Sequence, residues 1–230
     1  MPQKNSEASL FGNSTDGIDR RGFLKCMAWA GTGALCVLEG GVLKSYGLDD
    51  PARIAKAARG ELSFVQISDS HMGFNKPANS DVVATLKAAV GKIDALPVAP
   101  EFMLHTGDIS HLSKPEEFDT VDQILKSAPT QNVFFVPGEH DVLEDDGKQY
   151  LARYGKNTKG AGWYSFDHKG VHLIGLVNVM NLKAGGMGSL GAKQLEWLED
   201  DVKHLSKSTP GRVRAHAAVE YLSGMGMGHR

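Results

Sequence analysis

Three clusters of polar side chains in this sequence could bind metal ions. Asp69 and His71 form the first cluster, Asp108 stands in the second, and residues 138–141, Gly-Glu-His-Asp, form the third. Carboxylate oxygens combined with imidazole nitrogens suit zinc, manganese or iron better than the all-oxygen shells that calcium prefers. The residue types therefore predict a site for divalent transition-metal ions.

Each cluster directly follows a short apolar segment that is typical of a buried strand. The expected strands are residues 62–67, 102–105 and 133–136, and the expected helices between them are residues 80–96 and 115–126. This alternation indicates an α/β sheet whose faces are covered by helices. Ligands of open α/β sheets bind beyond the carboxyl ends of the strands, so we expect the clusters to converge in one crevice.

A pair of divalent ions is the arrangement that these ligands favour. Two cations about 3.5–4 Å apart share a bridging carboxylate, lower the pKa of a bound water and hold the oxygens of an in-line phosphoryl displacement. Asp108 is the expected bridge because it follows the middle strand of the three.

The motifs of these clusters, D-S-H, G-D and G-E-H-D, resemble the first three blocks of the calcineurin-like metallophosphoesterases. The resemblance implies an α/β fold, a four-layer αββα sandwich, with two divalent metal ions (Mn, Fe or Zn). It also implies that Asp69, His71 and Asp108 bind the first ion. Asp108 and Glu139 would bind the second ion.

The resemblance further implies that His140 and Asp141 are the catalytic residues. His140 would contact the phosphate and protonate the leaving oxygen, and Asp141 would orient His140. The family usually has Asn at the position of Glu139. The longer, anionic side chain would add negative charge beside an anionic substrate.

The predicted activity is metal-dependent hydrolysis of phosphate mono- or diesters through a metal-bound hydroxide at the two-metal site, with a small phosphoester as substrate. Two alternatives stay open. One is a noncatalytic truncated remnant or metal-binding protein, which metal stoichiometry would separate from the enzyme. The other is a purely structural α/β domain directed to export.

The second half of the chain predicts a hairpin and a further helix. Strands are expected at residues 163–166 and 171–179, and a helix with a broad apolar face at residues 190–205. The acidic run 199–201 on that helix is expected to be solvated surface. Five other histidines are expected to be structural or surface residues, with the one nearest Asp108 as the candidate exception. They are His105, His111 (the exception), His168, His172 and His204.

The N-terminal segment resembles a twin-arginine (Tat) export signal. Arg20 and Arg21 precede a weakly apolar run, residues 26–38, that is too short and too rich in Gly and Ala to span a membrane. We expect residues 1–45 to be the signal and residues 46–60 a linker. The protein is then periplasmic or secreted, with the Tat machinery as a partner and no stable membrane anchor.

Charge and cysteine content exclude two other classes of protein. The formal net charge is −2, and no cluster of Lys or Arg lies beyond the N-terminus, which predicts no nucleic-acid-binding patch. The two cysteines, Cys26 and Cys36, fall in the expected signal, so the rest of the chain cannot form a disulfide framework.

The last part of the metallophosphoesterase pattern is not recognisable. The partial domain is expected at residues 61–210, and neither the family's later His block nor its G-H-x-H motif follows it clearly. In a shifted reading frame, residues 213–228 can encode a segment like the fourth block, followed by two Trp codons at Met225–Gly226 and Met227–Gly228. We therefore hypothesise a frameshift near Pro210 that leaves residues 211–230 as an aberrant tail and the fold incomplete. Exposed strand edges would then lower solubility, and lost ligands would impair activity.

Overall fold

The computed structural model describes seven stretches of the chain: residues 33–39, 42–48, 54, 62–179, 182–183, 188–205 and 212–216. Their elements alternate between strands and helices for most of the length. In chain order they are β1 (Ala34–Glu39), β2 (Val42–Gly47), β3 (Leu62–Ile67), α3 (Val82–Asp94), β4 (Met103–His105), α4 (Pro115–Leu125), β5 (Val133–Phe135), the 3-10 helix η1 (His140–Val142), α5 (Lys148–Tyr154), β6 (Tyr164–His168), β7 (Val171–Leu176), α6 (Ala192–Lys203) and β8 (Arg212–His216).

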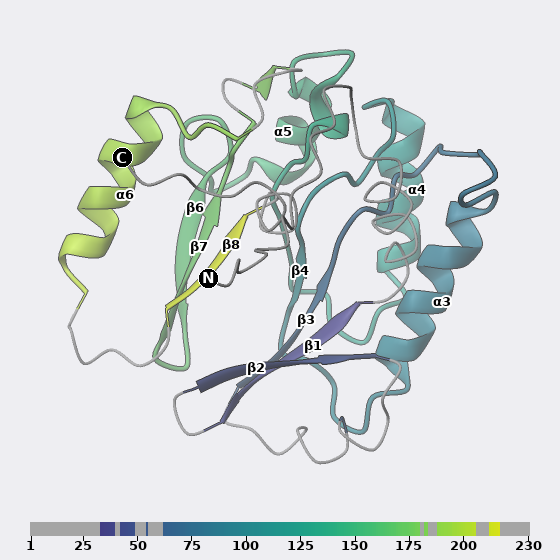
Figure 1. Cartoon of the computed structure of the whole chain (residues 1–230), viewed down its shortest axis with the longest axis horizontal. Helices are drawn as coiled ribbons and strands as arrows, with labels where there is room; N and C mark the ends of the chain where they lie inside the picture. The colour runs from purple at the N-terminus through teal and green to yellow at the C-terminus, as the bar shows by residue number, and fades with distance from the viewer. Residues whose placement is uncertain are drawn as a thin grey trace, which may run out of the picture.

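Two β-sheets pack face to face between layers of helix (Figure 1). The larger sheet has the strand order β2-β1-β3-β4-β5, and the smaller sheet has the order β6-β7-β8. Helices α3 and α4 lie on the outer side of the larger sheet, and α6 lies on the outer side of the smaller one. The predicted α/β fold with layers in the order αββα is confirmed.

Alternate residues of β3 enter two different hydrophobic cores. Val65 and Ile67 belong to the core that the larger sheet shares with α3 and α4. Leu62 and Phe64 belong to the core between the two sheets, where the ring of Phe64 stacks on that of Phe102 at 4.8 Å between centroids. Both faces of the strand bury apolar side chains, which explains why four of its six residues are apolar.

The expected elements agree with the observed ones to within one to three residues at most ends. Strands β3, β4 and β5 are parallel neighbours, so their carboxyl ends lie at the same edge of the sheet. The hairpin is also confirmed, because β6 and β7 pair antiparallel. Its turn uses Lys169 and Gly170 at positive φ, 47° and 75°.

Described residues before position 61 contribute to the larger sheet and its core. Part of the expected signal forms β1, which pairs antiparallel with both β2 and β3. Leu35 and Val37 are buried in the core, as are Leu48 and Ile54 from the expected linker. The hydrophobic run is thus partly a core strand, and residues 1–32 of the expected signal lie outside the described residues. Among the described helices, none has the length and apolar character needed to cross a bilayer.

Three further features were not expected. Helix α5 is one, and β8, which pairs parallel with β7 inside the expected aberrant tail, is another. The third is Asp201, which was expected on the solvated surface. Its carboxylate is only 16% exposed, accepts a hydrogen bond from Ser165 Oγ at 2.7 Å and lies 2.8 Å from His172 Nε2. It therefore fastens α6 to the smaller sheet.

Candidate metal centre

The loops that follow β3 and β4 remain paired beyond the ends of the strands. The amide of Asp69 donates to Gly107 O at 3.0 Å, and the amide of His71 donates to Asp108 O at 2.8 Å. Asp69, His71 and Asp108 all have left-handed backbone, with φ of 56°, 40° and 48°. Side chains other than glycine seldom adopt this conformation, and it costs about 1–3 kcal/mol at each residue. The surrounding hydrogen bonds hold the strained loops in place.

These three residues bring their ligand atoms together. His71 Nε2 lies 3.8 Å from Asp69 Oδ1 and 3.5 Å from Asp108 Oδ2, and the three atoms lie within 4.8 Å of one another. Burial, and then the neighbouring histidines, lower the pKa of His71 to about 3, so its imidazole is neutral at physiological pH. Burial raises the pKa of Asp108. A neutral imidazole beside two carboxylates is a donor set that fits a divalent transition metal.

Gly138 brings the third cluster against Asp108. A Cβ atom at this position would lie 2.1 Å from Asp108 Oδ1 and 2.4 Å from Asp108 N, so only glycine fits. Two residues later, the amide of His140 donates to Asp108 Oδ1 at 3.0 Å. The loop after β5 therefore forms a hydrogen bond with one carboxylate oxygen of Asp108, and the other oxygen faces His71.

Asp141 lies deeper in the protein than its expected role, orienting His140, requires. Its carboxylate is completely buried and accepts hydrogen bonds from the amides of Ile109, Ser110 and Gly138 and from Ser110 Oγ, at 2.8–3.1 Å. Burial and the nearby Asp108 carboxylate raise the pKa of Asp141 to about 7, against the effect of these donors. It joins the loops after β4 and β5.

The ring of His140 is oriented by another group. His140 Nδ1 lies 2.7 Å from the carbonyl oxygen of His111. The four donors above occupy the Asp141 carboxylate, and the contact of the His140 ring is with the backbone of His111. The catalytic roles expected of His140 and Asp141 stay predictions.

His111 also brings a third imidazole to the site. Its ring stacks on that of His140 at 4.9 Å with 17° between the planes, and it meets the ring of His71 edge-on at 5.7 Å. The three imidazoles have ligand atoms within 4.8 Å of one another. The sequence singled out His111 because it lies near Asp108.

The site residues expected from sequence are thus not all in one ligand set. Glu139 belongs to neither converging group among the described residues, although its charge helps to raise the pKa of Asp108. Sequence reasoning missed Glu117, a buried carboxylate three residues into α4, which accepts from amides of the His111 loop. A buried acid at the start of a helix, shortly after the G-D motif, was the available signal.

Other histidines have local partners. His105 is completely buried, with Nε2 2.9 Å from Ser70 Oγ, and burial lowers its pKa to about 3. His168 pairs with Glu101 at 2.7 Å. These contacts support the expectation that both are structural.

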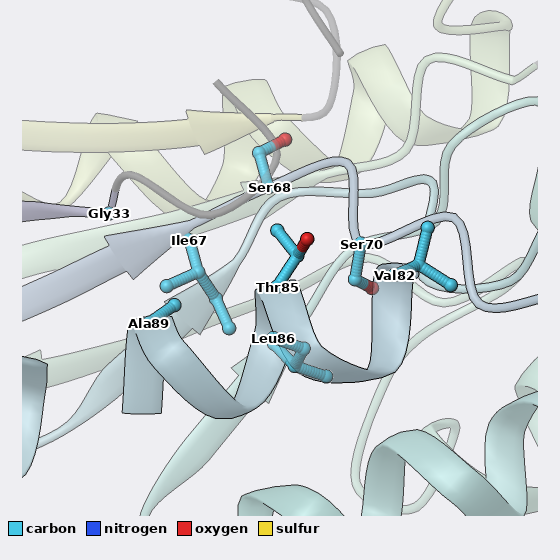
Figure 2. Close-up of a pocket in the computed structure, with 8 residues that line it drawn as sticks. All are labelled: Gly33, Ile67, Ser68, Ser70, Val82, Thr85, Leu86 and Ala89. Atoms are coloured by element: carbon cyan, nitrogen blue, oxygen red, sulfur yellow. The ribbon is translucent and has the colours of Figure 1, made fainter. Parts of the chain in front are cut away.

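The hollow nearest to these loops is too small for a substrate. Figure 2 shows it between the end of β3 and α3, lined by Ser68, Ser70 and Thr85 among other residues. Its volume is about 10 Å³, which is room for one water molecule at most.

Comparison with known proteins gives one family. The family model described as calcineurin-like phosphoesterase matches residues 62–226, which include every residue of the site above. The comparison with curated proteins gives no match. Among solved structures, a purple acid phosphatase from yellow lupin (Lupinus luteus) seeds has 13% sequence identity and a TM-score of 0.44. The similarity covers 64% of this chain and 28% of the lupin chain, so this chain spans less than a third of that structure.

Proposed function

Because the chain belongs to the calcineurin-like phosphoesterase family, we propose that it hydrolyses phosphate mono- or diesters with the aid of divalent metal ions. The observation that carries the proposal is that the ligand atoms of Asp69, His71 and Asp108 lie within 4.8 Å of one another. The backbone of all three residues is left-handed and therefore strained in this position. A purely structural role would leave this strain unexplained.

Asp69, His71 and Asp108 would hold the first ion. For the second ion, Asp108 is proposed as the ligand shared with the first ion and Glu139 as the other ligand. Bound divalent ions would supply an activated water and would offset negative charge on the phosphoryl oxygens. The protein prepares the site by keeping His71 neutral, so that no proton has to leave it before its nitrogen can bind a cation.

His140 is proposed to serve the leaving group. Its Nδ1 is held by the His111 carbonyl, which leaves Nε2 to face the substrate. From this position the imidazolium would donate its Nε2 proton to the departing oxygen. Asp141 is proposed to hold the loops after β4 and β5 at the spacing that this transfer requires.

Two measurements on purified protein test the proposal. Hydrolysis of a nitrophenyl phosphodiester and a nitrophenyl phosphomonoester is followed with Mn²⁺ or Zn²⁺, and bound metal is counted after dialysis. Asp108→Asn should abolish turnover and lower the metal content, whereas Asp94→Asn, on the exposed end of α3, should change neither. Two metal equivalents with Asp108-dependent turnover support the enzyme. Metal binding without turnover supports the noncatalytic alternative.

Export and the reading frame are further parts of the proposal. We propose that the segment containing Arg20 and Arg21 directs the protein through the Tat pathway, which replacing both with Lys should block. We also propose a frameshift near Pro210. Because β8 begins just after this point, the shift would change side chains rather than strand pairing. The nucleotide sequence decides the matter, since a gene without a downstream frame encoding G-H-x-H contradicts it.

A further inference from the structure

We infer that Glu117 is a positioning residue for His140, acting through the backbone of His111. Glu117 lies on α4, outside the three motifs, and its carboxylate fixes the loop whose carbonyl holds the His140 ring. The catalytic consequence rests on the proposed function. The contacts among Glu117, His111 and His140 do not depend on the proposed function, so the geometric part and the catalytic part of the inference can fail separately.

The first contact is between Glu117 and the loop that precedes α4. Its side chain is buried, and Oε2 accepts from the amides of His111 at 3.1 Å, Leu112 at 2.8 Å and Lys114 at 3.3 Å. A carboxylate that accepts several amide hydrogens forms stronger bonds than a neutral acceptor does. The other oxygen, Oε1, lies where a Cβ on Gly73 would be only 2.2 Å away, so Gly73 leaves the carboxylate its space.

The second contact is between the same loop and His140. The carbonyl of His111 can only accept a hydrogen bond, so His140 Nδ1, at 2.7 Å, must carry a hydrogen. In the neutral imidazole this choice leaves Nε2 without a proton, and Nε2 carries one only in the imidazolium that the proposed function uses. The backbone of His111 therefore sets both the direction of the ring and its tautomer.

Ring packing reinforces the arrangement. The His111 ring stacks on His140 and is itself braced by Phe74, whose ring meets it edge-on at 5.1 Å. The stacked His111 ring, 17° from parallel, therefore limits how far the His140 ring can turn.

Removing the Glu117 carboxylate would release this chain of contacts. Three buried or half-buried amides would lose their common acceptor, and the carbonyl of His111 would no longer be held in one direction. His140 would then populate both tautomers and a wider range of ring orientations. A shift of about 1 Å in a group that takes part in catalysis can lower the rate on the order of 100-fold.

The first test is the tautomer of His140, read by nitrogen-15 NMR of the imidazoles in purified protein. Wild type should show His140 protonated at Nδ1, and Glu117→Ala should show a mixture. Glu117→Gln, which keeps the length and an oxygen acceptor, should retain most of the wild-type state. Glu116→Ala, on the exposed neighbour, is the matched control. If Glu117→Ala does not fold, Glu117→Asp, which is too short for all three amides, replaces it. An unchanged tautomer in the folded variant overturns the inference.

The second test compares two phosphodiesters that differ in the leaving group. A nitrophenolate departs without a proton, whereas an alkoxide needs one, so misplacing His140 should slow only the alkyl ester strongly. We expect Glu117→Ala to lose on the order of 10- to 100-fold more kcat on the alkyl ester than on the nitrophenyl ester. Equal losses on both esters overturn the inference. If wild type hydrolyses neither ester, the proposed function fails, while the NMR result still decides the geometry.

Discussion

Replacing Gly138 with Ala should displace Asp108 and destabilise the fold. The added Cβ would lie 2.1 Å from Asp108 Oδ1 and 2.7 Å from its Cγ, whereas ordinary contacts begin at 3.4 Å. Asp108 cannot retreat easily, because its carbonyl accepts from His71 N and its Oδ1 accepts from His140 N. Overpacking of this kind costs about 1–3 kcal/mol, and the overlap here exceeds 1 Å at the carboxylate, so we expect about 3 kcal/mol.

Gly91→Ala is the matched control. Gly91 lies on the exposed side of α3, and nothing lies within 4 Å of its missing Cβ. Alanine should stabilise the helix there by up to about 1 kcal/mol. The two variants should therefore change the free energy of unfolding in opposite directions, which urea denaturation measures, and only Gly138→Ala should weaken metal binding in calorimetric titration. A Gly138→Ala protein with unchanged stability and metal affinity would refute the proposed contact between this loop and Asp108.

Three further predictions concern buried charge and metal. Asp141→Asn should lower the free energy of unfolding in urea by about 2–4 kcal/mol, because the new amide hydrogens face donors instead of acceptors. A loss of only about 0.5 kcal/mol, which is typical of surface substitutions, would contradict this. Removing metal with a chelator should lower the melting temperature of wild type, since an ion present at 100 times its Kd stabilises by about 2.7 kcal/mol, and should hardly affect Asp108→Asn. Burial alone would lower the pKa of His172, but hydrogen bonds to Asp201 and Asp167 outweigh it and raise the pKa above 6.5. The stabilisation from His172 is then fully present below pH 6.5 and is lost as pH rises through the higher folded pKa. His172→Gln should remove this loss from urea midpoints measured between about pH 6 and pH 9; an equal pH dependence in both proteins contradicts the assignment.

Local patterns were sufficient to predict the elements that position the site. Strand β3 was predicted residue for residue, because its apolar side chains are buried on both faces and polar residues follow Ile67 directly. The hairpin of β6 and β7 was predicted from the short polar turn between two apolar runs. In each of these cases the signal lies within one short segment of the chain.

Features that depend on distant contacts were missed. Leu35 and Val37 look like a signal's apolar core until β1 pairs with β3, which follows it by more than twenty residues. The hydrogen bonds of Asp141 could not be predicted either, since sequence cannot show that two amides of the loop after β4 and one of its own loop occupy its oxygens. Asp201 belongs to an acidic run that indicates solvated surface, whereas its own partners, Ser165 and His172, lie on β6 and β7.

The central claim is that Asp69, His71 and Asp108 share a divalent cation. The most direct measurement is an anomalous difference map from a crystal of the protein grown with Mn²⁺. We predict a manganese peak within bonding distance of a carboxylate oxygen of Asp69, Nε2 of His71 and a carboxylate oxygen of Asp108. Well-ordered loops with no peak between these three side chains, or a peak held by other residues, would contradict it.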